Sequence, residues 1–249
     1  MVNTFEKILI LGGYSGITQA VLNLLAKDGL KFYLVGRQID KLNIVRDHIL
    51  TLANCKVDVE SFDLTRIEEH RDLLERVLKT MNGLDLLFVC YGVLPNQLEL
   101  EQEPEKAFEN YQVNAISAIN FVSHAANYFE KRQSGTIAVV SSVAGDRGRK
   151  TNYFYGSAKS CLDTYLEGLR HRLYGKNVRV VTIKPGTVDT PMTAHLERKV
   201  LVASAEQVGK DIVRAIQKGM DVVYTPWYWK YIMWAVKCIP RKLFYRTNF

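Results

Sequence analysis

The sequence lacks any run close to the roughly 18 consecutive apolar residues that a membrane-spanning helix requires. Its first ten residues also lack the basic stretch and apolar core of a secretion signal. The four cysteines are far apart and form no Cys-x-x-Cys pair, which argues against a zinc site or a disulfide framework. We therefore expect a cytoplasmic protein with reduced thiols, neither secreted nor membrane-spanning.

Other absences concern the organisation of the chain. There is no internal repeat, no Pro- or Ser-rich linker and no low-complexity segment. With 47% hydrophobic and 24% charged residues, the composition excludes collagen-like and fully disordered chains. The five histidines show no metal-ligand spacing, so we expect no metal site. Among them, His195 is a candidate to face a substrate, although a packing role is favoured.

Strands and helices are predicted to alternate. Phe5–Leu11 is an apolar, β-rich run, and Ile17, Val21 and Leu24 recur after it at helical spacing. Repeated strand–helix units predict an α/β fold with a doubly wound parallel sheet and helices on both faces, because parallel connections need long crossovers. Further strands are expected near Lys31–Val35, Lys56–Phe62, Leu84–Cys90, Thr136–Ser141, Val178–Ile183 and Val222–Tyr224, and helices around residues 39–53, 66–81, 105–131, 155–174 and 205–218.

The positive charge is concentrated at the C-terminus. Residues 226–249 carry five of the seven net positive charges, no acidic residue and all three tryptophans. The other 225 residues are nearly balanced, and no basic recognition motif is visible, so we expect no nucleic-acid partner. We divide the chain into a domain over residues 1–225 and an aromatic-basic tail over 226–249 that belongs to the same domain.

A glycine turn follows the first predicted strand. In Gly12-Gly13-Tyr14-Ser15-Gly16-Ile17-Thr18, backbone N–H groups and a helix N-terminus can meet a pyrophosphate; a plain strand–helix turn is the alternative. The second strand ends at Arg37, where an acid would bind the ribose of NAD. Arg37 therefore favours the 2′-phosphate of NADP(H), with NAD still possible, and a solvated arginine is the alternative.

Tyr155 follows Ser142 by thirteen residues, and Lys159 lies one helical turn after Tyr155. A tyrosine works as an acid or base near neutrality only if positive charge stabilises its phenolate, and Lys159 and an oxidised nicotinamide would supply that charge. Ser142 can hydrogen-bond a substrate oxygen, and Asn114 can hold a water molecule that links Lys159 to solvent. Alone, the Tyr/Lys pair is equally compatible with a surface contact.

Taken together and in order, these motifs resemble the short-chain dehydrogenase/reductase family over residues 5–225. The resemblance implies a Rossmann-type NADP(H)-dependent oxidoreductase that reduces a ketone, with Tyr155 as proton donor. Thr18 replaces the third glycine of the family and is expected to loosen helix–strand packing. Tyr91, in Cys90-Tyr91-Gly92 where the family has Asn-Ala-Gly, is expected to narrow the adenosine side. By resemblance the catalytic residues are Asn114, Ser142, Tyr155 and Lys159, and the cofactor contacts are Gly12, Tyr14, Ser15, Gly16, Ile17, Arg37, Asp63, Leu64, Gly92, Tyr155, Lys159, Pro185, Gly186, Val188 and Thr190.

A closer resemblance, carried by residues 141–149, 152–159, 185–196 and 239–241, is to the ketoreductase partner of decaprenylphosphoryl-ribose 2′-epimerase. It implies a 2-keto sugar on a polyprenyl phosphate as substrate, made by a separate flavin oxidase. A steroid, retinoid or other lipophilic carbonyl is the second possibility, and a catalytically silent dinucleotide sensor is a third. Arg147, Arg149 and Lys150 form a basic loop that would meet a phosphate or remain solvated.

The tail favours a lipid-linked substrate on physical grounds. Tryptophan and tyrosine prefer the membrane–water interface, and neighbouring lysine and arginine are attracted to anionic headgroups. Residues 227–239 are too short to span a bilayer but suit a helix lying in the interface, here the inner face of the membrane. A buried C-terminal segment or an oligomer contact is the alternative, and a homo-oligomer is expected.

Overall fold

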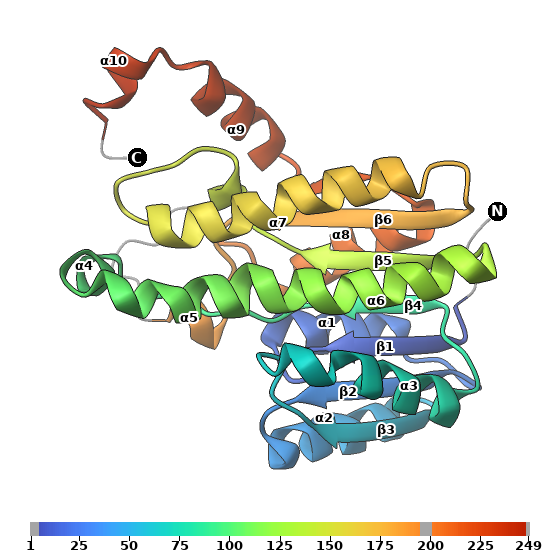
Figure 1. The fold of residues 1–249 in the computed structure, drawn as a ribbon. Helices are drawn as coiled ribbons and strands as arrows, with labels where there is room; N and C mark the ends of the chain where they lie inside the picture. The colour runs from blue at the N-terminus through green and yellow to red at the C-terminus, as the bar shows by residue number, and fades with distance from the viewer. Residues whose placement is uncertain (1–4, 195–200, 248–249) are drawn as a thin grey trace.

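The computed structural model describes residues 5–194 and 201–247, so His195 lies outside the described residues. In this part of the chain, seven parallel strands form one sheet in the order β3-β2-β1-β4-β5-β6-β7 (Figure 1). The expected doubly wound α/β fold is confirmed. The strands are β1 (Lys7–Leu11), β2 (Lys31–Gly36), β3 (Lys56–Ser61), β4 (Leu86–Val89), β5 (Gly135–Val140), β6 (Val178–Pro185) and β7 (Val222–Thr225).

Helices cover both faces of the sheet and bury alternate residues of each strand. Leu9 and Leu11 of β1 lie in one core, while Ile8 and Ile10 lie in the other. The inner strands, such as β1, β2, β4 and β5, are buried on both faces and almost continuously apolar, as parallel sheets require, whereas the edge strand β3 is partly exposed and carries polar residues. One face carries α3 (His70–Met81), α6 (Ser117–Arg132) and α7 (Tyr153–Arg172), and the other carries α1 (Gly16–Leu25), α2 (Ile39–Leu52) and α8 (Ala205–Lys218).

Shorter elements modify the predicted pattern. The helix expected over 105–131 is interrupted by a π-helical turn (η3, Gln112–Ile116), a feature that often marks functional positions. The tail is itself helical, with α9 (Trp229–Cys238) and α10 (Arg241–Phe244) separated by Pro240. The remaining elements are α4 (Gln97–Gln102), α5 (Ala107–Tyr111) and the 3-10 turns η1 (Ile67–Glu69), η2 (Pro104–Lys106), η4 (Val143–Gly145) and η5 (Pro191–Thr193).

The tail packs beyond the sheet, beside the loop that follows β5 (Figure 1). Trp229, Met233 and Val236 on one side of α9 form a small apolar cluster with Val143 of that loop. None of the helices in 5–194 and 201–247 is both long and apolar enough to cross a bilayer.

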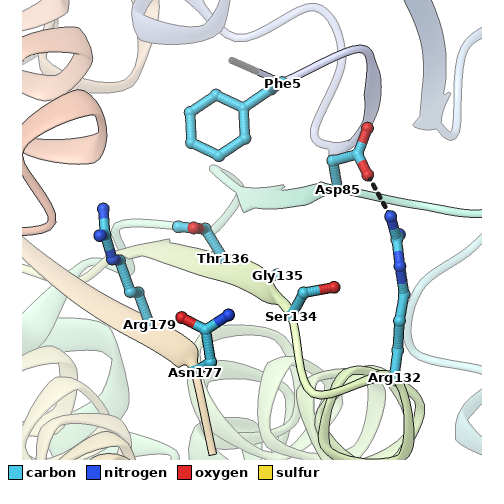
Figure 2. Close-up of a pocket in the computed structure, with 8 residues that line it drawn as sticks. All are labelled: Phe5, Asp85, Arg132, Ser134, Gly135, Thr136, Asn177 and Arg179. Carbon is cyan, nitrogen blue, oxygen red and sulfur yellow. Dashed lines mark hydrogen bonds and ion pairs between the residues drawn. The ribbon is translucent and has the colours of Figure 1, made fainter. Parts of the chain in front are cut away.

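The structure has a small cavity at the amino ends of the strands, with a volume of about 240 Å³ (Figure 2). Two of its lining residues, Arg132 and Asp85, form an ion pair in which the Nη2 and Oδ1 atoms are 2.8 Å apart. Ligands of open α/β sheets bind instead beyond the carboxyl ends of the strands, where the direction of winding reverses. In this sheet that point lies between β1 and β4.

Candidate active site

A second cavity, of about 640 Å³, lies at the carboxyl ends of the strands. It begins at the β1–β4 junction, where doubly wound sheets bind nucleotides. The cavity is lined by every cofactor contact expected from the sequence and by Ser142, Tyr155 and Lys159. Sequence reasoning therefore selected residues from six strand ends that the fold brings to one place.

The glycine turn forms one wall of this cavity. Gly12 has a φ of +89°, and a Cβ atom there would lie 2.3 Å from the carbonyl oxygen of Cys90. Only glycine permits both this backbone conformation and this approach. At the start of α1, the Ser15 hydroxyl accepts a hydrogen bond from the backbone N–H of Thr18, 3.1 Å away. The turn thus places Gly12 and Gly16 in the cavity lining, beside the N-terminus of α1.

Thr18 does not loosen the packing, contrary to expectation. Its side chain is fully buried, and its hydroxyl donates to the carbonyl oxygen of Gly12 at 2.9 Å. The Ser15 hydroxyl also lies 2.8 Å from the Thr18 hydroxyl. A threonine in place of the usual glycine therefore ties the helix to the turn, because its one polar atom finds partners there.

Two cations line the end of the cavity next to β2. Arg37 directly follows that strand, and Lys41 lies one turn into α2 with its Nζ atom 5.6 Å from the centre of the Tyr14 ring. Asp63, after β3, accepts hydrogen bonds from the backbone and hydroxyl of Thr65, which hold the pKa of its carboxyl below the ordinary value. Sequence reasoning missed Lys41, whose signal was only its position four residues after Arg37.

Tyr91, which was expected to narrow the adenosine side, lines the cavity. Its hydroxyl lies 2.8 Å from the hydroxyl of Ser117 on α6, and its ring packs against the core. The side chain lines the cavity with its polar atom already bonded.

The proposed reacting groups lie deeper, at the ends of β5 and the start of α7. Ser142 begins the turn η4 and accepts a hydrogen bond from the backbone N–H of Ala144 at 3.1 Å. Lys159 is only 3% exposed, donates to the carbonyl oxygen of Val140 at 3.4 Å, and has its Nζ atom 5.8 Å from the centre of the Tyr155 ring. The Tyr/Lys pair is therefore not a surface contact.

Burial dominates the ionisation of this pair. Burial raises the pKa of Tyr155 to about 12, although a hydrogen bond with Ser142 and the charge of Arg149 act to lower it. Burial also lowers the pKa of Lys159 to about 8, against the effect of the nearby Asp163. Tyr155 is thus a neutral phenol near pH 7, the form that donates a proton.

Asn114 lies behind the cavity, not in its lining. Its amide oxygen accepts from the backbone N–H of Val93 at 3.0 Å, and its amide nitrogen donates to the carbonyl oxygen of Val93 at 2.9 Å. A Cβ atom on Gly92 would lie 2.5 Å from that amide oxygen and 3.7 Å from the Lys159 Nζ atom. Glycine at position 92 therefore lets Asn114 lie close to Lys159.

A buried ion cluster supports the floor of the site. The Nζ atom of Lys184 lies 2.5 Å from Asp146 and 2.9 Å from Asp163, and the Tyr224 hydroxyl donates to Asp146 at 2.7 Å. Because Asp163 follows Lys159 by one helical turn, the cluster places a carboxylate that is paired with Lys184 next to Lys159. Lys184, on β6, thereby connects Asp146 of the loop after Ser142 to Asp163 of α7.

The three cations of the basic loop lie in different surroundings, because Lys150 is exposed while Arg147 and Arg149 are partly buried. Arg147 donates from Nη1 to the carbonyl oxygens of Val236 and Ile239, at the end of α9, and its guanidinium carbon lies 3.8 Å from the centre of the Phe244 ring. Arg149 instead turns into the cavity, where burial lowers the pKa of its guanidinium. The loop thus both anchors the tail and supplies one cation to the site.

The tail also reaches the cavity. Trp229, the first residue of α9, lines it together with Pro185 and Gly186 at the end of β6 and with Val188 and Thr190 beyond. Sequence reasoning treated the tail aromatics as one group, in a membrane-surface or a packing role, and missed both Trp229 and Asn152 as cavity residues. No local sequence signal separates Trp229 from Trp227.

The cavity fits a nicotinamide dinucleotide. The fit rests on the glycine turn in the cavity lining, the helix N-terminus at Gly16, the cations beside β2 and a volume of about 640 Å³. A Cβ atom on Gly16 would lie 3.3 Å from Thr190, so the glycine turn and the loop after β6 enclose the same space.

Comparison with known proteins agrees with this geometry. The family model described as short chain dehydrogenase matches residues 6–201. An uncharacterized oxidoreductase of Streptomyces coelicolor is 31% identical over 97% of this chain and 95% of its own length. An uncharacterized oxidoreductase of Mycobacterium tuberculosis is 28% identical over 94% of each chain.

Solved structures show the same fold. A short chain dehydrogenase from Burkholderia cenocepacia in complex with NADP has a TM-score of 0.79 at 21% identity, covering 96% of each chain. Levodione reductase has a TM-score of 0.79 at 18% identity, covering 90% of this chain and 97% of the other. On the family match and the relative in Streptomyces, the chain belongs to the short-chain dehydrogenase/reductase family of oxidoreductases.

Proposed function

We propose that the protein reduces a ketone to a secondary alcohol with NADPH. The observation that carries this proposal is the meeting of Ser142, Tyr155 and Lys159 in a cavity that fits the dinucleotide. When bound, the reduced nicotinamide supplies a hydride to the carbonyl carbon. The Tyr155 phenol donates its proton to the carbonyl oxygen, so one ketone, one NADPH and one proton yield one alcohol and NADP⁺.

The neighbouring residues have distinct tasks in this scheme. The Ser142 hydroxyl holds the carbonyl oxygen beside Tyr155, with which it already shares a hydrogen bond. Lys159 stabilises the phenolate left after proton donation, and Asn114 holds a water molecule through which that proton is replaced from solvent. The neutral state of Tyr155 supports a role as acid in the reductive direction.

NADP(H) is proposed over NAD(H) because two cations line the site where the adenosine ribose would lie. Arg37 and Lys41 are placed to bind a 2′-phosphate, and no acidic residue lines the cavity directly after β2. The Burkholderia relative of the same fold is a complex with NADP.

For the substrate we propose a 2-keto sugar on a polyprenyl phosphate, formed by a flavin oxidase partner. The sequence resemblance supports this class, and so do polar residues beside Tyr155, among them Arg149 and Asn152. A steroid, retinoid or other lipophilic ketone would meet these polar groups less favourably, since buried polar groups need partners. Members of the family commonly act on small molecules as homo-oligomers, and the same is proposed here.

The tail supports the proposal that the protein acts at the cytoplasmic face of a membrane. Trp227, Tyr231 and Trp234 follow helical spacing and are 70%, 62% and 68% exposed, while Trp229 and Met233 point inward. We call Trp227, Tyr231 and Trp234 the aromatic face. The cations Lys230, Lys237, Arg241 and Lys242 lie on the same segment. Exposed aromatic rings beside cations suit an anionic lipid surface.

The decisive experiment follows NADPH oxidation by the purified protein with a membrane lipid extract, with and without a candidate flavin oxidase. Oxidation that requires the oxidase supports the keto-intermediate. The Tyr155→Phe variant is the matched control, because it removes only the phenolic oxygen. We expect its kcat to fall by at least about 10²-fold while NADPH still binds. Near-normal turnover in this variant would refute the mechanism, and NADPH binding without turnover of any ketone would favour a sensor.

A further inference from the structure

Trp229 forms part of the catalytic cavity although it belongs to the tail. It is 7% exposed and lines the same cavity as Ser142 and Tyr155. Its indole ring lies directly on Gly186, where a Cβ atom would be only 1.9 Å from the indole nitrogen. The missing side chain at position 186 thus makes room for the ring at the end of β6.

The position of Trp229 is held from outside the cavity. Met233 and Val236 on the next turns of α9 pack with Val143, the residue after Ser142. Arg147 binds the carbonyl oxygens at the far end of the same helix. Because the middle and the far end of α9 are fixed to the loop after Ser142, the indole has a defined place relative to the proposed reacting groups.

The indole N–H is buried and has no hydrogen-bond partner among the described residues. An indole nitrogen can only donate, so it needs an acceptor. Buried donors without a partner are rare in folded proteins and call for a specific explanation. A ligand in the cavity that brings an acceptor oxygen to Trp229 supplies one.

Asn152 has a matching requirement. It lines the cavity three residues before Tyr155, and within 5–194 and 201–247 its buried amide oxygen has no hydrogen-bond partner. An amide presents one acceptor and two donors, whichever way it is oriented. A hydroxyl group both donates and accepts, so it is the simplest ligand group that satisfies the amide and the indole.

We propose that Trp229 and Asn152 are specificity-determining residues that recognise a hydroxyl group next to the substrate carbonyl. The substrate class is then a hydroxyketone, and an apolar ketone is rejected because it leaves both groups unpaired. This inference rests on the proposed function, since it places the carbonyl at Ser142 and Tyr155. It adds the tail to the substrate site.

The test compares two ketones of nearly equal size, 2-hydroxycyclohexanone and 2-methylcyclohexanone, with NADPH and the full-length protein. We expect wild-type kcat/KM to favour the hydroxyketone by about tenfold or more, roughly the value of one or two hydrogen bonds. Trp229→Phe keeps an aromatic ring but removes the donor. The preference should therefore shrink by about tenfold, because kcat/KM falls for the hydroxyketone and stays the same for 2-methylcyclohexanone. Asn152→Ala should act in the same direction. The exposed Tyr174→Phe is the control and should change neither rate.

Three results would overturn the inference: equal wild-type kcat/KM for the two ketones, a Trp229→Phe effect of equal size on both, or a loss of NADPH affinity in that variant that accounts for its effect. The last would assign the indole to the cofactor. If neither ketone is reduced, the proposed reductase activity fails on these probes. The inference is then tested by the binding of the corresponding alcohols, cyclohexane-1,2-diol and 2-methylcyclohexanol, to the NADP⁺ complex. Tighter binding of the diol to wild type, with this preference reduced in Trp229→Phe and Asn152→Ala, supports the inference, and equal binding of the two alcohols overturns it.

Discussion

Arg147 donates a hydrogen bond to the carbonyl oxygen of Ile239 at 2.9 Å and thereby joins the loop after Ser142 to the end of α9. The two residues are 92 positions apart in the chain. Cations at a helix C-terminus stabilise the last carbonyl groups, and here the cation comes from the loop after Ser142. The position of α9, and with it Trp229, therefore depends on that loop.

The first prediction concerns this contact between Arg147 and the end of α9. Arg147→Ala should release the end of α9, since a hydrogen bond from a charged donor contributes about 2 kcal/mol. We expect trypsin to cleave the tail at Lys237 or Arg241 faster than in wild type, in a limited-proteolysis time course read by mass spectrometry. The exposed Arg214→Ala is the matched control. Cleavage at the wild-type rate in Arg147→Ala would show that the apolar cluster alone holds the tail.

The second prediction tests the cations beside β2. Arg37→Ala and Lys41→Ala should each weaken NADPH binding, by a few kcal/mol at most for a charged hydrogen bond, and should leave NADH binding nearly unchanged. NADH lacks the 2′-phosphate and so serves as the internal control. Fluorescence titration of both cofactors measures the effect. Equal losses for the two cofactors, or a wild-type preference for NADH, would contradict the assignment.

The third prediction is a pH dependence of stability that arises from Lys159. Its pKa is about 8 in the folded protein and about 10.5 when unfolded. Between these values the unfolded chain binds more protons, so this lysine makes the free energy of unfolding rise with pH from about 8 to 10.5. Below pH 8 the burial of the charged lysine lowers the free energy of unfolding by about 3 kcal/mol at most.

Lys159→Met removes this contribution at similar side-chain length. Urea denaturation at several pH values should therefore show wild type gaining stability relative to Lys159→Met as the pH rises through this window. The exposed Lys210→Met should run parallel to wild type. A constant difference between wild type and Lys159→Met from pH 7.5 to 10.5 would contradict the lowered pKa.

Sequence reasoning predicted the parts of the site that depend on local order. The glycine turn, Arg37 and the Ser142–Tyr155–Lys159 spacing each follow from a strand end or one helical turn, and the parallel sheet gathers strand ends at one edge. The seven strands were predicted to within a few residues. The inner strands are apolar and buried on both faces, while the edge strand β3 is partly exposed and shows only the alternation of Val57 and Val59 with polar residues.

The parts that depend on distant contacts were not predictable. Arg147 resembles any loop arginine until α9 is placed against it, and the compensation at Thr18 requires the carbonyl oxygen of Gly12 within reach. Trp229 and Trp227 have similar neighbours in sequence, yet one is buried in the cavity and the other is exposed. Their difference arises from the packing of α9 on Val143.

The last prediction concerns the aromatic face and an anionic membrane. The intact protein should sediment with vesicles of phosphatidylglycerol and phosphatidylcholine at low salt. A simple truncation at Trp227 is a poor test, because it also removes Trp229 from the cavity. Changing Trp227, Tyr231 and Trp234 together to serine removes the exposed rings and leaves Trp229 and Met233 in place.

We expect the triple variant to lose vesicle binding and to slow reduction of a lipid-linked ketone, while reduction of a small water-soluble ketone is unchanged. Salt adds a second criterion. Raising it from 0.1 M to 1 M shortens the Debye length from about 10 Å to about 3 Å, so wild-type binding should weaken but keep a part due to the aromatic rings. Serine at Leu98, Phe108 and Tyr174, which are similarly exposed, is the matched control and should bind like wild type. If the triple variant still binds vesicles but changes oligomeric state, the aromatic face is a contact between subunits, and the membrane proposal fails.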